Sequence, residues 1–392
     1  MTERIETVVI GGGQAGLSVG YHLQQRGRPF VILDGNPRVG DSWRNRWDSL
    51  RLFTPARANG LDGMRFPAKG DAFIAKDQMA DYLEAYARRF NLPVRNGVRV
   101  RRLSQQGDGF AIEAGDTTYE ASNVVVAMSS YQESWRPAFA ANLHPGILQL
   151  DAASYKNPSQ LQKGPVLVVG VGNSGADIAL DVARSHKTIL AGTESGVIPG
   201  DIEGFFGRQI MFRLVRFFGH HILSLKTPIG RKMRPKMMHR TVPLIRVKPA
   251  QLVDAGVERV ERMAGVKDGL PLTQDGQTLD VANVIWCTGF RPGFIWIDIP
   301  VLGDGQEPMH HAGIVGNVPG LYFVGLQFLY AMTSATVTGV GRDARRVVKH
   351  LVATRSDGAR QRRSQTWLEM LTAVGAPYAH SLAAEPDGQG LD

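Results

Sequence analysis

A glycine-rich turn between an apolar run and a helical pattern occurs twice in this 392-residue chain, and it limits the fold more than any other feature. In the first copy, the apolar run at 8–10 breaks into a turn that holds Gly11, Gly13 and Gly16. The first glycine permits a tight turn, the second lets the backbone approach a pyrophosphate, and the third lets the following helix pack on the strand. The stretch therefore predicts a strand, a phosphate-binding turn and a helix.

The second copy follows the same order in the middle of the chain. An apolar run at 166–169 breaks into Gly170, Gly172 and Gly175, and a helical pattern continues over 176–183 before another strand at 188–190. Two copies in the same context predict an α/β protein with two Rossmann-like domains, each binding a dinucleotide. If one dinucleotide is held permanently and the other exchanges, the arrangement is that of a flavin enzyme reduced by a nicotinamide cofactor.

The two copies differ where the adenosine ribose would bind. Asp34 ends the apolar run that follows the first turn, which suits two free ribose hydroxyls. After the second turn come Thr193 and Glu194, with no arginine beside them in the sequence for a 2′-phosphate. Thr193 with a basic residue such as Arg208 would favour NADPH, and Glu194 would favour NADH, so both cofactors stay open.

The bulk properties place the chain among globular proteins of more than one domain. Its length suggests two domains, and its N-terminus lacks the charged and apolar pattern of a secretion signal. A single cysteine, Cys287, excludes an internal disulfide and favours a reducing compartment, so we expect a cytoplasmic protein. Cys287 stands in an apolar strand pattern, which indicates a buried hydrophobe rather than a nucleophile. The histidine pairs at 220–221 and 310–311 lack further ligands, so no metal site is expected.

The formal net charge of +9 is concentrated in one segment. No acidic residue stands between Glu203 and Asp254, whereas this interval holds basic residues at 208, 213, 216, 226, 231, 232, 234, 236, 240, 246 and 248. Because these basic residues carry more positive charge than the net charge of the whole chain, the remaining residues together carry a small negative charge. A locally basic segment argues against a general nucleic-acid-binding surface.

The basic segment predicts an amphipathic helix over 205–223, because arginines alternate there with large apolar residues. Three interpretations stay open. The helix could pack on the nicotinamide domain at the rim of a substrate entrance, form a lid or channel wall for an apolar substrate, or attach residues 205–240 peripherally to an anionic membrane.

Several other segments have simpler expectations. The Arg- and Trp-rich stretch at 40–55 is expected to be a ligand-lining loop. Asp77 is expected to cap a helix over 78–90, and residues 94–128 are expected to form a small antiparallel sheet. The tail over 355–392, with an amphipathic piece at 367–371, is expected to be loosely docked or partly disordered.

These features together resemble the flavin-containing monooxygenase family, within the flavoproteins that have two dinucleotide-binding domains, with this chain as an atypical member. The resemblance covers about residues 5–352 and rests on the two glycine turns and four further stretches: Gly40–Leu52, Asp280–Pro292, Gly320–Gly325 and Gly341–Ala344. It implies a discontinuous FAD-binding domain, 1–160 and 280–392, around an inserted NAD(P)H-binding domain, 161–279, whose basic helical insert covers 203–250.

The resemblance also implies which residues hold each cofactor. FAD is expected on Gly11, Gly13, Gln14, Ala15, Gly16, Asp34, Gly35, Trp43, Arg44, Val100, Ala127 and Gly325. NADPH or NADH is expected on Gly170, Gly172, Asn173, Ser174, Gly175, Thr193, Arg208 and Thr288. Thr288 and Gly289 match the linker through which the chain returns to the FAD domain.

The implied reaction begins with hydride transfer from NAD(P)H to the flavin. Dioxygen then adds to the flavin C4a carbon, and the resulting hydroperoxide delivers one oxygen atom to a small, apolar organic substrate. The protein's part is positioning, exclusion of water and hydrogen bonding.

The chain departs from the family pattern beside the flavin. Phe53 stands where relatives place Asn or His, Asp151 and Ala152 replace a His-Ser pair, and Met128-Ser129 replaces Thr-Gly. Phe53, Arg44 and Asp151 are the flavin-side candidates. The departures favour a rival function, an NAD(P)H-dependent reductase or oxidase that passes electrons to a quinone, a protein acceptor or dioxygen. A flavin-bound regulatory or binding module is a third alternative.

Overall fold

The computed structural model describes residues 1–193, 196–238 and 242–354. The chain divides into two compact units, 1–347 and 348–392. Of the second unit the structure describes 348–354, which are helical. The predicted character of the tail over 355–392 and the proposed role of Glu194 therefore lie outside the described residues.

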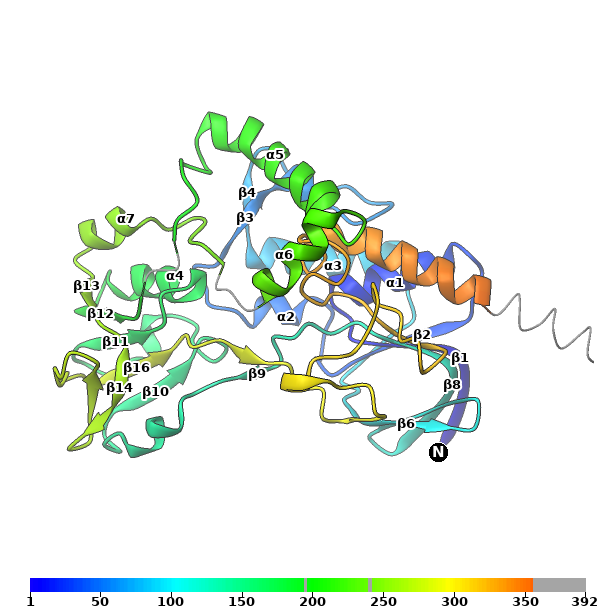
Figure 1. The fold of residues 1–392 in the computed structure, drawn as a ribbon, viewed down its shortest axis with the longest axis horizontal. Helices are drawn as coiled ribbons and strands as arrows, with labels where there is room; N and C mark the ends of the chain where they lie inside the picture. Colours follow the sequence, from blue (N-terminus) through cyan, green and yellow to red (C-terminus); the bar gives the residue numbers. More distant parts are fainter. Residues whose placement is uncertain (194–195, 239–241, 355–392) are drawn as a thin grey trace, which may run out of the picture. The chain divides into compact units, whose positions relative to one another are not determined.

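The first unit contains a sheet of eight strands in the order β18-β6-β7-β8-β1-β2-β5, with β19 pairing β8. Its centre is parallel: Val8 of β1 lies opposite Val31 of β2 and Val124 of β8. The strands are β1 (Thr2–Ile10), β2 (Phe30–Asp34), β5 (Val94–Asn96), β6 (Val100–Gln106), β7 (Gly109–Ala114), β8 (Thr117–Val126), β18 (Ile297–Asp298) and β19 (Leu321–Phe323). Strands from both ends of the described chain thus meet in one sheet (Figure 1).

A second sheet of five parallel strands has the order β10-β16-β11-β12-β13. Its strands are β10 (Leu148–Asp151), β11 (Val166–Val169), β12 (Thr188–Ala191), β13 (Glu258–Val260) and β16 (Asn283–Trp286). Every residue of β11, β12 and β16 is buried, as expected of parallel strands that are covered on both faces. The two sheets confirm the predicted α/β class.

The helices include the two that follow the glycine turns. Their bounds are α1 (Gln14–Gln24), α2 (Asp41–Arg44), α3 (Lys76–Arg89), α4 (Asn173–Val182), α5 (Phe212–Phe217), α6 (Pro228–Met238) and α7 (Pro249–Asp254). Two π-helical turns, Gly207–Met211 and Phe218–Ile222, flank α5. A further helix begins at 337, and 3₁₀ turns cover Ala56–Ala58, Ala138–Asn142, Pro158–Gln160 and Asp304–Gln306. None of the described helices is long and apolar enough to cross a membrane.

Three short ribbons complete the strands: β3 (Arg51–Pro55) with β4 (Phe73–Ala75), β14 (Met263–Lys267) with β15 (Leu270–Thr273), and β9 (Glu133–Ser134) with β17 (Phe290–Arg291). The third ribbon joins the two sheets. The chain leaves the first sheet after β8 through β9, and returns from β16 through β17. Because β9 and β17 pair in antiparallel fashion, the two crossings are hydrogen-bonded to each other.

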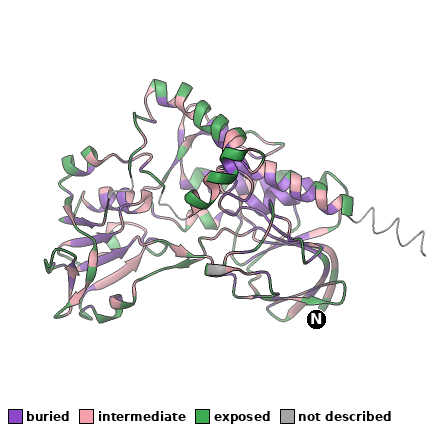
Figure 2. Cartoon of the chain, in the orientation of Figure 1, coloured by how far each residue is buried: buried purple, intermediate pink, exposed green. Residues whose placement is uncertain are grey.

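Separate buried clusters lie at the two sheets. In Figure 2 the colour of buried residues follows the strands of both sheets. These buried side chains form the close-packed hydrophobic clusters of the two sheets. Trp47, from the loop predicted to line a ligand, is buried in a cluster of the second sheet with Tyr155 and Val168. This part of the loop therefore packs on the core rather than on a ligand.

Two local predictions were wrong. The helix expected over 78–90 is α3, which begins at Lys76 after an N-cap at Ala75, so Asp77 lies in the first turn and is not the cap. The Gln78 side chain instead accepts a hydrogen bond from the Ala75 amide, at 2.9 Å. The antiparallel strands expected over 94–128 do form, but they continue the first sheet, because β8 pairs with β1. The proposed domain boundaries stay a prediction.

Candidate functional site

The first glycine turn closes tightly between β1 and α1. Gly11 has a φ of 108°, and its amide donates to the Leu33 carbonyl at 2.8 Å. A Cβ on Gly16 would lie 1.8 Å from the Gly11 carbonyl oxygen, so only glycine lets α1 approach the turn this closely. A Cβ on Gly13 would meet only the Ser42 hydroxyl, at 3.9 Å. The turn is thus closed on the protein side and open on the side where a pyrophosphate is expected.

Asp34 lies at the carboxyl end of β2, buried beneath the turn. Its Oδ2 accepts from the Gly12 amide at 2.8 Å, and its Oδ1 accepts from the amide and the side chain of Asn36, also at 2.8 Å. These bonds fix the carboxylate at the end of the strand, where a ribose is bound in folds of this type. Gly35 follows it and faces Arg99, whose Cβ lies 3.6 Å from a Cβ built at Gly35.

The other residues predicted to bind FAD divide into those beside the turn and those held elsewhere. Ala15 lies next to Gly325, where a built Cβ would approach the Ala15 Cβ to 3.0 Å. The Ala127 amide donates to the Ile10 carbonyl at 2.8 Å, which holds the end of β8 against the turn. Val100 begins β6 and packs against the hydrophobic core of the first sheet. The structure therefore gathers Ala15, Ala127 and Gly325 at one place, and gives Val100 a packing role.

Helix α2 connects the loop to the first turn. The Trp43 indole Nε1 donates to the Gln14 side-chain oxygen at 3.2 Å, so two predicted FAD residues touch. Arg44 binds Asp81 at 2.8 Å and Glu84 at 2.7 Å, and donates to the Val39 carbonyl at 2.7 Å. Since its guanidinium is held by acids of α3, Arg44 fixes α2 on α3, and a direct contact with flavin stays a prediction.

The second turn repeats the geometry of the first. Gly170 has a φ of 111°, and a Cβ there would lie 2.3 Å from the Cys287 carbonyl oxygen. A Cβ on Gly175 would lie 1.8 Å from the Gly170 carbonyl oxygen, the same separation as at Gly16. Gly172 is the N-cap of α4, and Ser174 lies in its first turn. The two turns therefore share one backbone geometry, which in both cases suits a dinucleotide phosphate.

Asn173 has a second task. Its side-chain oxygen accepts from the Ile245 amide at 2.9 Å, and its Nδ2 donates to the Pro243 carbonyl at 3.1 Å. These bonds tie the first residue of α4 to the far end of the basic insert.

The ribose end of the second turn contains arginines that the sequence reasoning missed. The Arg262 Nε donates to the Thr193 hydroxyl at 2.7 Å, and Arg259 donates to the Gly192 carbonyl at 3.1 Å. Arg259 lies within β13, which pairs with β12 in the second sheet, and Arg262 follows two residues after the end of β13. Arg208 lies elsewhere, over the Phe73 ring at 5.6 Å. The basic residue beside Thr193 is therefore Arg262.

The predicted flavin-side residues have mixed surroundings. Phe53, on β3, is 43% exposed. Asp151, at the end of β10, forms a two-pronged ion pair with Arg136 through bonds of 2.6 and 2.8 Å. The Thr288 hydroxyl donates to the Trp135 carbonyl and so ties the returning chain to the segment after β9. The sequence did not single out two polar groups near Phe53, those of Thr54 and Asn59. Asn59 is fully buried, and its side-chain oxygen accepts a hydrogen bond from the Thr54 hydroxyl at 2.5 Å.

Cys287 and the histidine pairs show no reactive cluster. Burial raises the pKa of the Cys287 thiol to about 12, so it stays protonated at neutral pH. Within the described residues, no three His, Cys, Asp or Glu side chains are placed to hold a metal ion. The His220 Nδ1 instead shares a hydrogen bond with the Thr333 hydroxyl.

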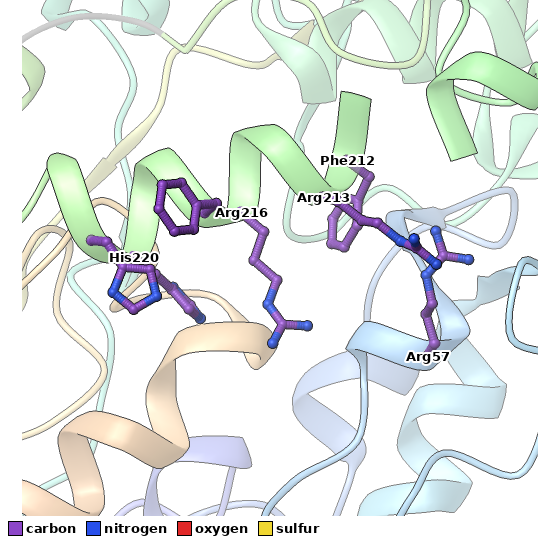
Figure 3. Close-up of a pocket in the computed structure, with 7 residues that line it drawn as sticks. Arg57, Phe212, Arg213, Arg216 and His220 are labelled. Carbon is purple, nitrogen blue, oxygen red and sulfur yellow. The ribbon is translucent and has the colours of Figure 1, made fainter. Parts of the chain in front are cut away.

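The basic insert forms a groove with the rest of the first unit, of about 350 Å³ (Figure 3). Its lining consists of three arginines, two histidines and two phenylalanines: Arg57, Phe212, Arg213, Arg216, Phe217, His220 and His221. The Arg57 and Arg213 guanidinium groups point toward one another in Figure 3. Burial, Arg342 and Arg216 lower the pKa of His220 to about 4, so this imidazole adds no positive charge to the groove at neutral pH.

Comparison with known proteins agrees with this geometry. The family profile described as pyridine nucleotide-disulphide oxidoreductase matches residues 8–198. A CzcO-like oxidoreductase of Geobacillus kaustophilus is 35% identical over 354 residues, which cover 90% of this chain and 99% of that protein. The chain belongs to the CzcO-like oxidoreductases. These CzcO-like proteins have more distant plant relatives: a probable indole-3-pyruvate monooxygenase of Arabidopsis thaliana, YUCCA1, is 27% identical over 72% of this chain and 75% of its own length.

A solved structure extends the comparison. A flavin-containing monooxygenase from Stenotrophomonas maltophilia superposes with a TM-score of 0.72 and 28% identity, over 90% of this chain and 99% of that one. The predicted relation to the flavin-containing monooxygenases is thus confirmed, and the CzcO-like protein is an enzyme of the flavoprotein oxidoreductase class. The predicted cofactors are confirmed at the family level, because flavin monooxygenases use FAD and NADPH.

Proposed function

We propose that this CzcO-like protein is an NADPH-dependent FAD monooxygenase that inserts one atom of dioxygen into a small, apolar organic substrate. The observation that carries the proposal is the pair of glycine turns with one geometry, each at the carboxyl end of a parallel strand and each followed by a helix. When bound, FAD supplies hydride acceptance and oxygen activation, by the C4a route expected from the sequence.

The chain's own residues bind and orient this group at the first turn. The backbone from Gly11 to Gly13 and the N-terminus of α1 face the pyrophosphate, and the fixed carboxylate of Asp34 accepts the ribose hydroxyls. We propose that Trp43, which donates a hydrogen bond to Gln14 beside the turn, helps to hold the flavin ring. We propose the same phosphate role for the turn from Gly170 to Gly175 toward NADPH.

The nicotinamide preference follows from Arg262. Its guanidinium donates to Thr193 after the second turn, and a planar guanidinium suits a phosphate through two parallel hydrogen bonds, which supports a role in binding the 2′-phosphate. We therefore propose NADPH rather than NADH, with Arg262 and Thr193 as the phosphate-binding pair in place of Arg208.

Aromatic side chains support an apolar substrate. Tyr131 and Phe290 pack edge to face, with ring centroids 5.8 Å apart, and the Arg46 guanidinium covers Phe290 at 5.9 Å. These residues lie along the crossings between the two sheets, close to the β9 and β17 ribbon. With the exposed ring of Phe53, they supply apolar surface for a substrate, as binding pockets between domains commonly do. The single half-buried Cys287 supports a cytoplasmic location.

A rival function is favoured by one observation. Asp151 is held by Arg136, and Phe53 offers no hydrogen bond, so neither can steady bound oxygen. In that case the enzyme would pass electrons from NADPH to a quinone, a protein acceptor or dioxygen without oxygenating a substrate.

Rapid mixing separates the two functions. The enzyme loaded with FAD is reduced by NADPH without oxygen and then mixed with oxygenated buffer that contains an aryl thioether. A monooxygenase gives a spectral transient distinct from reduced and oxidised flavin, and isotopically labelled dioxygen places its label in the sulfoxide. Direct return to oxidised flavin, with one hydrogen peroxide per NADPH and no labelled product, would refute oxygenation and leave an oxidase.

A further inference from the structure

The helical insert carries a large exposed apolar face. Its exposed fraction is 81% at Phe205, 62% at Phe206 and 52% at Phe218, and Ile210 and Leu214 between them are also exposed. Residues 206, 210, 214 and 218 recur every fourth position, so they form a stripe along the helix. Figure 2 shows the exposed colour along this helix. Of the three interpretations, burial of the apolar face against the protein is therefore contradicted for this stripe.

The helix contacts the rest of the first unit near both of its ends, at Arg208, which lies over the Phe73 ring, and at Gly219. A Cβ on Gly207 would lie 2.2 Å from the Asp201 carbonyl oxygen, and one on Gly219 would lie 2.5 Å from the Met332 side chain. Arg342 also donates to the His220 carbonyl at 2.8 Å. Gly219 lets the end of the helix approach the protein closely, while the large apolar side chains of the stripe are exposed.

Positive charge borders the apolar stripe. Arg213 and Arg216, on the helix that carries the stripe, line the groove of Figure 3 together with Phe217, which is also 54% exposed. Among the described residues, no carboxylate lies within ion-pair distance of Arg57, Arg213 or Arg216. Exposed basic residues continue at Lys226, before α6, and along α6 at Arg231, Lys232 and Lys236.

We propose that this insert docks the enzyme on an anionic membrane surface, with the stripe from Phe205 to Phe218 entering the region between head groups and acyl chains. Basic residues flanking an exposed aromatic and aliphatic face are the features that hold a helix in the plane of a bilayer interface. The arginines of the groove would receive phosphate groups of the lipids. This proposal concerns where the enzyme acts and does not depend on the oxygenation step.

Charge complementarity favours lipid over the other occupants of such a face. A second copy of the chain would bring the same unneutralised arginines against each other around a shared apolar contact, which costs free energy. A small apolar substrate would cover only part of a stripe that extends over more than three helical turns, and it would leave the arginines without partners. An anionic bilayer satisfies both the apolar stripe and the charge.

The test uses the full-length enzyme loaded with FAD and two kinds of vesicle. Vesicles of phosphatidylcholine alone are compared with vesicles in which about one third of the lipid is phosphatidylglycerol, and bound enzyme is measured by flotation. The enzyme is expected to float with the anionic vesicles, to remain free with the neutral ones, and to dissociate as salt is raised.

Two variants divide the interaction into its parts. R213Q/R216Q should weaken binding to anionic vesicles roughly 30-fold, from about fivefold for each charge at a membrane surface. F206S/L214S/F218S should abolish flotation while FAD content and the rate of NADPH oxidation stay unchanged, because these side chains lie outside the proposed cofactor sites.

Matched controls remove equal features elsewhere. K163Q/K267Q neutralises two exposed lysines, and I295S/V253S removes two exposed aliphatic side chains, at 68% and 66% exposure. Both controls should bind anionic vesicles like the parent enzyme.

Three results would overturn the proposal. One is equal binding to neutral and anionic vesicles, and another is no binding to either. The third is that F206S/L214S/F218S converts a dimer to a monomer in sedimentation but leaves flotation unchanged. The stripe would then be a contact between two copies of the chain.

Discussion

The two glycine turns allow a matched pair of substitutions that tests which dinucleotide each turn binds. Gly16→Ala and Gly175→Ala each place a methyl group 1.8 Å from a backbone carbonyl oxygen, Gly11 in one case and Gly170 in the other. The perturbation is thus the same in chemistry and in size, and the two variants differ only in the turn that they disturb.

The size of the effect follows from this separation. A methyl carbon normally stays more than about 3 Å from a carbonyl oxygen, so the helix and turn must separate by roughly 1 Å, and overpacking of this kind costs about 1–3 kcal/mol. If ligand binding must restore the native turn, the dissociation constant rises by the same free energy, about 5-fold to 150-fold. We expect G16A to weaken FAD binding by this amount, and G175A to weaken NADPH binding with FAD retained.

The assay measures two constants for each variant. FAD is titrated into the apoprotein by flavin fluorescence, and NADP⁺ is titrated into the FAD-loaded enzyme by calorimetry. Gly13→Ala is the control for the fold, because its methyl group has room at 3.9 Å from Ser42 yet projects toward the expected pyrophosphate. It should lose FAD affinity with little change in thermal stability. If G16A weakens only NADP⁺, or G175A only FAD, the cofactor assignment is wrong.

Three further predictions concern single residues. Arg262→Ala should raise the dissociation constant for NADP⁺ about tenfold, the effect of one charge-assisted hydrogen bond of roughly 1.5 kcal/mol, and leave that for NAD⁺ unchanged; equal losses for both would contradict the 2′-phosphate role. Burial raises the pKa of Asp177 from its ordinary 3.8 to about 6, so its contribution to stability is present below pH 4 and lost as pH rises through 6. Asp177→Asn keeps a partner for Arg246, so its free energy of unfolding should exceed that of the parent by up to about 3 kcal/mol above pH 7. The measurement is urea unfolding at several pH values; a difference between variant and parent that does not change with pH would contradict the raised pKa. Tyr155→Phe removes the buried hydrogen bond to Asp181, 2.9 Å long, and should lower the free energy of unfolding by about 1.5 kcal/mol at unchanged FAD content; an unchanged denaturation midpoint would rule this contribution out.

The sequence predicts best where one local motif sets both structure and chemistry. The turns at Gly11 and Gly170 were predicted because a glycine spacing, a preceding apolar run and a following helix all belong to one continuous stretch. The class of enzyme followed from having two such turns. The Gln14 contact with Trp43 was also within reach, since both residues were expected at the same cofactor.

Features that depend on pairing between distant segments were missed. Arg262 reaches Thr193 only because β13 lies beside β12, and nothing in the sequence near Thr193 indicates that neighbour. The same reason explains why the strands over 94–128 were expected to form a separate sheet, although β8 joins β1. Strand order is set by tertiary packing, which a local pattern does not contain.

The direction of the amphipathic face was left open by the sequence. The pattern over 205–223 correctly indicates a helix with an apolar side, but periodicity does not say whether protein or solvent lies against it. Gly219 was an available signal, because a glycine in an otherwise bulky helix indicates a place where the backbone comes close to a neighbour, here Met332.

The ribbon of β9 and β17 has a consequence for how such a chain can be rebuilt. Because Ser134 lies opposite Phe290, the chain departs toward the second sheet and comes back from it at neighbouring backbone positions. A segment whose two ends already meet can be cut out and its neighbours joined by a tight turn, since the remaining strands keep their spacing. We therefore expect that the second sheet can be exchanged for that of a relative through a join within this ribbon, provided that Trp47, which packs on that sheet, is exchanged with it.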